Sequence, residues 1–354
     1  MTREAFKTAL LDSLRMNRSV ILVVLAYIAI ALVLGRLAGF DVALQIYSKQ
    51  STIIIFASMW IVLVPIILVQ LYRHRPTSPI RFVWHLVMKD LQVVQRVIIA
   101  LPCILLFPVF SSAFTSIKSA IGILHPYGLD PLFARLDSVI HGGHAWELIH
   151  PLVGFPVVTF ALNLSYNLWL IPLWMTFALV TVMTNERELR EQYLLSFFAC
   201  WILLGSAAAV AFSSVGPCFY ERFYPADPYA PLMSYLRSVN DIYPVWALPT
   251  QDMLWAKHLS EKPGLGSGIS AMPSLHLAIA ALNALMLSRL SRIAGILGWL
   301  YVLVILIGSV HLGWHYAIDG YASIAAVLLI WWAAGCWAAR STAPEPAPVP
   351  VAST

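Results

Sequence analysis

The strongest constraint on the fold is a series of apolar stretches, each close to the length of a helix that crosses a lipid bilayer. Such a helix needs roughly 20 consecutive apolar residues, and the chain contains about eight stretches near that length. They cover residues 20–35, 52–72, 97–116, 152–183, 193–212, 272–287, 293–310 and 317–339. Because 60% of the 354 residues are hydrophobic and only 11% are charged, a soluble globular protein is excluded. We predict an all-α, polytopic membrane helical bundle with about eight transmembrane helices.

Two of these stretches have unusual lengths. Residues 152–183 are too many for one straight crossing, so they form either one tilted helix or a re-entrant piece followed by a helix that is broken near Pro172. Residues 272–287 are few for a full crossing.

The distribution of basic residues predicts the orientation. Cytoplasmic loops carry an excess of Lys and Arg, and a cytoplasmic N-terminus places most of the 22 Lys and Arg residues in short inner segments. We therefore expect a multi-pass integral membrane protein, of a bacterial inner membrane, with both chain ends inside. The net charge of +5 reflects this topology, and since no clustered basic face is evident, no nucleic-acid partner is expected. Of the four cysteines only Cys218 falls in an outer loop, so no disulfide framework is expected.

Two outer segments carry their own patterns. Asp130-Pro131 is typical of a helix N-cap followed by Pro at the first helical position, and Gly142-Gly143 is typical of a helix end. The apolar residues between them lie on one stripe, which fits a helix in the outer membrane interface or, equally, a short helix packed on the bundle. Residues 213–270 form a long outer loop rich in Pro, Tyr, Asp and Gly, and we expect a partly ordered lid there.

Polar residues gather in two short motifs near the C-terminal end. The first is Pro-Ser-Leu-His at residues 273–276, and the second is His-Tyr-Ala-Ile-Asp at residues 315–319. The spacing of His315 and Asp319 places both on one helix face, where the carboxylate can orient the imidazole. The predicted topology brings His276, His315 and Asp319 to the same outer face. Ionisable groups at membrane depth are costly unless they are paired and used.

These residues suit phosphoryl transfer. A neutral imidazole held by a carboxylate is a good nucleophile, and a second His can protonate the departing oxygen. Ser274 and the free N–H groups at the start of the helix that follows it offer an anion site. Gly268, in a glycine-rich stretch at residues 264–268, would let backbone amides approach a phosphate closely.

The two motifs resemble the last two signature motifs of the type 2 phosphatidic acid phosphatase superfamily, and the Pro-Ser-Leu-His and His-Tyr-x-x-Asp forms resemble its inositol phosphorylceramide synthase-like branch. The resemblance implies that His315 is the nucleophile that forms a phosphohistidine, with Asp319 as its partner and His276 as the general acid. It implies a membrane phospholipid or lipid phosphate substrate, a lipid or sugar alcohol as acceptor, and no metal or organic cofactor. By this comparison the chain divides into an N-terminal region with three transmembrane helices (1–116), a catalytic membrane domain (117–340) and a disordered Pro/Ala-rich tail (341–354).

The chain departs from the superfamily pattern in its cations. The first motif, a Lys followed by Arg-Pro, has no match, because Arg75-Pro76 lacks the Lys and falls on the inner side. The Arg that usually follows the Ser of the last motif is replaced by Val310. Phosphoryl transfer needs cations, so other residues of the outer side must supply them. The candidates are Arg222, Arg237, Lys257, Lys262, Lys118 and His311, with Arg222 and Lys262 favoured for their position in the long loop.

Other interpretations stay open. His276, His311, His315 and Asp319 could instead hold a metal ion, and the missing cations fit a catalytically inactive lipid carrier on the same fold. His311 is either a substrate-binding or a hydrogen-bonding interfacial residue. Asn163, Tyr166 and Asn167 form a polar helix face that contacts either the substrate or a neighbouring helix. Within the enzyme hypothesis, water as acceptor gives a phosphatase and an alcohol gives a phosphotransferase.

Overall fold

The computed structural model describes residues 3–260 and 263–342, and this part of the chain is helical without any β-strand. Six segments in it are long and apolar enough to cross a membrane. They are α2 Arg18–Ala38, α5 Val93–Ser119, α9 with α10 (Pro156–Thr181), α11 with η2 and α12 (Arg187–Ala211), α16 Arg292–His311 and α17 Ala317–Ser341. The all-α membrane bundle is thus confirmed. The number of eight spans is not, because α15 Leu275–Leu290 and residues Leu63–His74 of α3 are shorter apolar helices.

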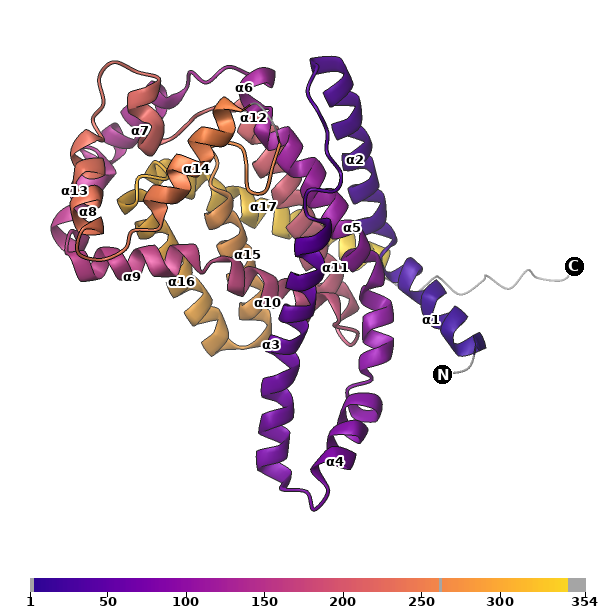
Figure 1. The fold of residues 1–354 in the computed structure, drawn as a ribbon. Coiled ribbons are helices and arrows are strands. Elements are labelled where there is room, and N and C mark those ends of the chain that lie inside the picture. Colours follow the sequence, from indigo (N-terminus) through magenta and orange to yellow (C-terminus); the bar gives the residue numbers. More distant parts are fainter. Residues whose placement is uncertain (1–2, 261–262, 343–354) are drawn as a thin grey trace, which may run out of the picture.

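The remaining helices lie around these spans. α3 Ser48–His74 leads into α4 Pro79–His85 and the π-helical turn η1 Leu86–Asp90. Figure 1 shows this hairpin extending past the lower end of the bundle, with α7 and α14 at the upper end. The other short helices are α1 Arg3–Met16, α6 Ile121–Leu124, α8 Ala145–Val153 and α12 Ala209–Ala211. Residues 343–354 of the expected tail lie outside the described residues.

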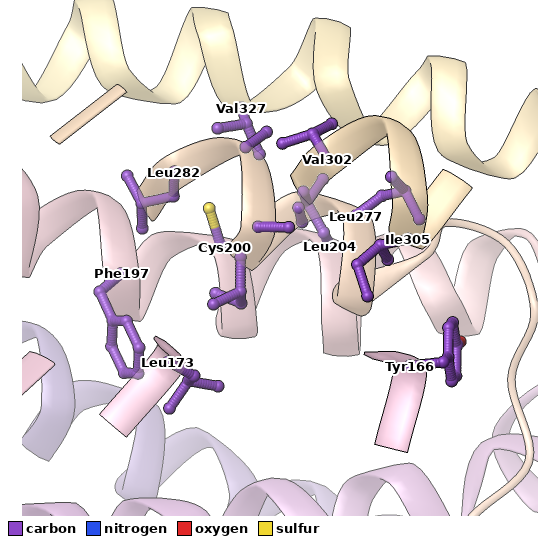
Figure 2. Close-up of a cluster of buried hydrophobic side chains, with 14 of the residues drawn as sticks. Tyr166, Leu173, Phe197, Cys200, Leu204, Leu277, Leu282, Val302, Ile305 and Val327 are labelled. Atoms are coloured by element: carbon purple, nitrogen blue, oxygen red, sulfur yellow. The ribbon is translucent and has the colours of Figure 1, made fainter. Parts of the chain in front are cut away.

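The centre of the bundle is α11 Arg187–Ala199, which continues into the π-helical segment η2 Cys200–Ala208. α11 packs against α2 from the N-terminal part of the chain and against α17 from the C-terminal part. α15 packs against α16, α17 and η2. Figure 2 shows side chains of these helices meeting in one apolar core, among them Phe197, Cys200, Leu277, Val302 and Val327. Helices from both halves of the chain therefore form one body.

The long apolar stretch at residues 152–183 is interrupted. α9 Pro156–Asn167 ends before a turn at Leu168 and Trp169, and α10 is Leu170–Thr181. The predicted break near Pro172 was therefore a few residues late. Pro172 lies in the first turn of α10, where its missing N–H is not needed for a helical hydrogen bond.

The helix predicted between Asp130 and Gly142 is present as α7 Asp130–His141, and it ends at Gly142 in the left-handed conformation. Its buried residues include Phe133 and Ala134, whereas four apolar side chains are exposed. These are Leu132, Leu136, Val139 and Ile140. An exposed apolar stripe on a helix that is also packed on the bundle favours a position in the membrane interface.

The segment expected to be a partly ordered lid is largely helical. It contains the short 3-10 helix η3 Pro217–Arg222, α13 Ala230–Asn240 and α14 Ala247–Leu259. Asn163 of α9 holds the start of α14, because its side-chain carbonyl accepts the Ala247 N–H at 3.1 Å and its amide donates to the Pro244 carbonyl at 3.3 Å. Long-range hydrogen bonds thus give this segment a defined path over the bundle.

A buried guanidinium near the start of α11 connects three helices. Arg190 of α11 is 1% exposed. It donates to the side-chain oxygen of Asn17, just before α2, at 2.7 Å and to the Thr181 carbonyl, at the end of α10, at 3.2 Å. In an apolar environment these bonds are strong, and unpaired partners would be costly.

We expect Arg190→Ala to lower the free energy of unfolding by about 3 kcal/mol, because buried hydrogen bonds to a charged group are lost and their acceptors are left unpaired. Thermal unfolding of the purified protein in detergent measures the effect. Arg187→Ala is the matched control, since Arg187 lies in the same helix and is exposed. Equal melting temperatures for the two variants would show that the buried cluster does not stabilise the fold.

Candidate functional site

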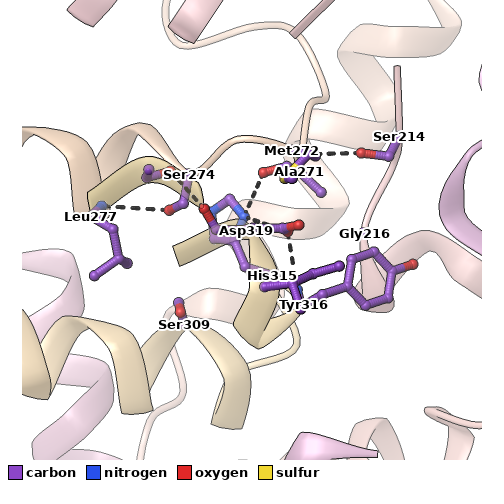
Figure 3. Close-up of polar contacts among 12 residues, drawn as sticks. Ser214, Gly216, Ala271, Met272, Ser274, Leu277, Ser309, His315, Tyr316 and Asp319 are labelled. Carbon is purple, nitrogen blue, oxygen red and sulfur yellow. Dashed lines mark hydrogen bonds and ion pairs between the residues drawn. The ribbon is translucent and has the colours of Figure 1, made fainter. Parts of the chain in front are cut away.

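The second motif forms a turn between α16 and α17 that places His315 at the start of α17. His315 Nδ1 lies 2.8 Å from the Ala271 carbonyl oxygen and 3.3 Å from Asp319 Oδ2 (Figure 3). Because a carbonyl oxygen can only accept, Nδ1 carries the proton and donates it. Nε2 is then the unprotonated nitrogen, which is the form an imidazole nucleophile requires.

Asp319 is fully buried in the first turn of α17. Its Oδ2 also accepts the Tyr316 N–H at 3.1 Å, so the carboxylate closes the start of the helix as well as orienting His315. Its Oδ1 is buried without a hydrogen-bond partner among the described residues. The position of Asp319 is therefore fixed by the helix backbone itself.

A second carboxylate, Asp130, supports the turn from α7. Its side chain accepts hydrogen bonds from the Tyr316 hydroxyl at 2.9 Å, the Gly216 N–H at 2.8 Å, the Val215 N–H at 3.0 Å and the Tyr224 hydroxyl at 3.2 Å. Burial raises the pKa of Asp130, and these donors oppose that shift. The prediction that Asp130 caps its own helix was wrong, because its oxygens are used by partners far along the chain.

Asp137, two turns further along α7, holds the same helix start. Its Oδ1 accepts the Ile318 N–H at 3.2 Å and its Oδ2 accepts the Ala145 N–H at 3.4 Å. Burial raises the pKa of Asp137 as well. Two aspartates of α7 thus fix the backbone that carries His315 and Asp319.

The first motif brings His276 to this turn from the start of α15. The His276 and His315 ring centroids are 6.1 Å apart, so the predicted pair of histidines does meet. Tyr166 stacks on His276 with centroids at 4.6 Å, and Trp169 lies at 4.3 Å. Ser274 is fully buried, and its hydroxyl accepts the Leu277 N–H at 3.5 Å as the N-cap of α15.

Both histidines line a cavity of about 500 Å³ between α5, α9, α10, η2, α14 and the loop before α15. Lys118, at the end of α5, is the only Lys or Arg among its described lining residues. The Lys118 side chain makes no hydrogen bond or ion pair with any other described residue, so its ammonium group is available to an anion.

Gly268 holds the loop before α15 against Lys118. Its φ of +99° is one that L side chains rarely adopt, and a Cβ there would lie 2.7 Å from Lys118 Cγ. Within the described residues, the N–H groups of Gly268, Ile269 and Ser270 form no hydrogen bond. The loop at Gly268, whose backbone amides were predicted to approach a phosphate closely, therefore lies beside the Lys118 cation. Free N–H groups next to a positive charge are what an anion site requires.

Neither of the two favoured cations is among the described lining residues. Arg222 is exposed and lies over the Trp255 ring at 4.5 Å, outside the cavity lining. Lys262 lies outside the described residues. His311 is fully buried with its Nε2 2.8 Å from the Thr159 hydroxyl, and it does not line the cavity either. Of the five candidates among the described residues, Lys118 is the one that lines the cavity with the histidines.

The polar residues of α9 have different surroundings: one contacts a neighbouring segment and another lines the cavity. Asn163 holds the segment before α14, whereas Tyr166 lines the cavity beside His276. The Tyr166 hydroxyl is buried without a partner among the described residues, and the same is true of Trp314 Nε1, whose side chain also lines the cavity. Both are donors that a bound anion could accept from.

The described residues contain no group of three or more His, Cys, Asp or Glu side chains that could hold a metal ion. His311, which the metal hypothesis combined with His276, His315 and Asp319, is bonded to Thr159 instead.

Comparison with known proteins gives one match. Residues 131–333 match a family model described as the PAP2 superfamily. No curated protein and no solved structure matches the chain. The matched range contains His276, His315 and Asp319, whereas Lys118 precedes it.

We expect Asp130→Ala to lower the free energy of unfolding by about 4 kcal/mol, because several buried donors lose their shared acceptor. The melting temperature of the purified protein reports the loss. Asp252→Ala is the control, since Asp252 is exposed in α14. A melting temperature as high as that of the control would contradict the supporting role of Asp130.

Proposed function

Because the chain belongs to the PAP2 superfamily, we propose that it is a lipid phosphate phosphatase or phosphotransferase of the membrane that works through a phosphohistidine. The observation that carries this proposal is the Ala271 carbonyl bonded to His315 Nδ1, which leaves Nε2 unprotonated in a cavity shared with His276 and Lys118.

In the first step Nε2 of His315 attacks the phosphorus, and the bond from phosphorus to the leaving oxygen breaks. His276 gives its proton to that oxygen, while Asp319 stabilises the charge that develops on His315. In the second step an acceptor hydroxyl attacks the phosphohistidine. Its proton passes to His276, the N–P bond breaks, and the site returns to its starting state.

Transfer to an alcohol, as in the inositol phosphorylceramide synthase-like branch, is the form that we favour. One ammonium group offsets the single negative charge of a phosphodiester, whereas a phosphomonoester carries up to two charges at neutral pH. Lys118 is the only Lys or Arg among the described lining residues, which supports a phosphodiester donor with a lipid or sugar alcohol as acceptor. Its presence beside the histidines also weakens the case for an inactive lipid carrier.

We further propose that the reaction takes place at the outer membrane face and that residues 117–340 form the catalytic domain. The distribution of Lys and Arg supports the orientation. The cavity nevertheless takes lining residues from both sides of the boundary at residue 117, including Phe114 and Lys118 of α5.

The test uses purified protein with a phosphate-labelled phospholipid or polyprenyl phosphate, with and without lipid and sugar alcohols. A labelled phospho-product that forms only with an alcohol indicates transfer, and free phosphate indicates hydrolysis. We expect His315→Ala to abolish both, because the nucleophile is lost. His125→Ala, an exposed histidine, is the control. Turnover that survives in the His315 variant would refute the phosphohistidine mechanism.

We expect Lys118→Met to lower kcat/KM by about 100-fold or more, because the transferred group loses its charge partner. Arg222→Met is the matched control and should change kcat/KM less than about threefold, since Arg222 lies on the surface. Initial rates over a range of substrate concentrations give both values. The reverse order of effects would assign phosphate binding to Arg222 and reject Lys118.

A further inference from the structure

The cavity continues well beyond the histidines, along one face of α5. Five lining residues of this helix lie three or four positions apart, as one helix face requires. They are Phe107, Ser111, Phe114, Thr115 and Lys118. At 1.5 Å per residue, the distance from Lys118 to Phe107 along the helix is about 16 Å. The lining row on α5 is therefore elongated, with Lys118 at one end of the row and Phe107 at the other.

The end opposite Lys118 is apolar. Phe107 and Trp174 meet edge to face with centroids 4.8 Å apart. Phe177 and Phe197 lie behind Phe107 at 5.3 and 6.2 Å. We call Phe107 and Trp174 the aromatic floor. A chain that enters from the Lys118 end meets this floor and the buried core behind it.

The side wall of the cavity is formed by the π-helical segment η2. Gly205 of η2 lines the cavity, and a Cβ there would lie 2.5 Å from Leu275 Cδ1 and 2.7 Å from Phe114 Cε2. π-helical turns are rare and are often found at functional sites. An added Cβ at Gly205 would displace Leu275 and Phe114, both of which also line the cavity.

We propose that the inner part of this cavity is a chain-length-limiting subsite, which holds one apolar chain of the lipid substrate along α5 and ends at the aromatic floor. This inference rests on the proposed function, since it places the phosphate at Lys118 and the histidines. The occupant is apolar because the lining away from Lys118 is mostly Leu and aromatic side chains, including Leu173, Trp174 and Trp201, with Ser111 as a polar exception. It is one chain because the cavity holds only about 500 Å³ in total.

Physical chemistry gives the expected profile. Each methylene group buried against an apolar wall raises kcat/KM by about fourfold, as long as space remains. A chain longer than the subsite must bend or stay outside, so the gain stops. Turnover should therefore rise with chain length to a limit and then level off or fall.

The experiment measures His315-dependent turnover of lysophospholipids with one acyl chain of increasing length. We expect Trp174→Leu to move the limit to longer chains by several carbons, because the floor is lowered at the end far from the phosphate. Gly205→Ala should move the limit to shorter chains, because Phe114 and Leu275 are pushed into the cavity. Trp332→Leu, an exposed tryptophan of α17, is the matched control and should keep the wild-type limit.

The outcomes separate the inference from the proposed function. The subsite would be overturned, and the mechanism left standing, by two results together. His315→Ala loses turnover, and the three other variants all keep the wild-type chain-length limit. Turnover that persists in His315→Ala would overturn the mechanism first. If Trp174→Leu fails to fold, as its melting temperature would show, Gly205→Ala still decides the question, because an unchanged or longer limit in that variant rejects the subsite.

Discussion

The start of α17 is the point on which the candidate site depends, and one buried carboxylate controls it. Asp319 accepts the Tyr316 N–H and lies beside His315 Nδ1, so the bond that closes the helix also places His315. A buried carboxylate in an apolar bundle is costly unless its surroundings hold it in place. Asp130 and Asp137 of α7 provide this support by accepting hydrogen bonds from Tyr316 and from the Ile318 backbone. Helix α7 therefore determines the geometry of the candidate site.

The N-terminal helices take part in the site although the family match begins at residue 131. α5 contributes Lys118, and Tyr47 before α3 bonds through its hydroxyl to the Gly266 N–H at 3.0 Å. The loop that carries Gly268 is thus held between the N-terminal region and His315, whose Nδ1 bonds to Ala271 of the same loop. The Lys residue that lines the cavity with the histidines thus lies outside the matched range.

The sequence predicts features that depend on local patterns and misses those that depend on tertiary packing. Hydropathy identifies the membrane bundle, and the spacing of His315 and Asp319 predicts their pairing, because both follow from helix geometry. The bounds of α7 follow from Pro131 and Gly142 for the same reason. The partner of Asp130 is not local, since Tyr316 lies 186 residues away, and a capping rule could not find it. The sequence identifies Lys118 as a candidate cation but does not rank it above the other candidates. Whether Lys118 lies near the histidines depends on which face of α5 lines the cavity.

The cavity exists because the helices around it depart from the regular α-helix. η2 is π-helical, α9 and α10 are separated by a turn, and α5 contains Pro108 next to Phe107 of the aromatic floor. Regular helices of this length would pack along their whole faces and leave little space. Irregular backbone is tolerated at membrane depth only where protein or a cavity covers it, so the three irregularities are expected to face the same interior space. Their position around Lys118, His276 and the aromatic floor explains how one elongated space can combine a polar end for chemistry with an apolar end for a chain.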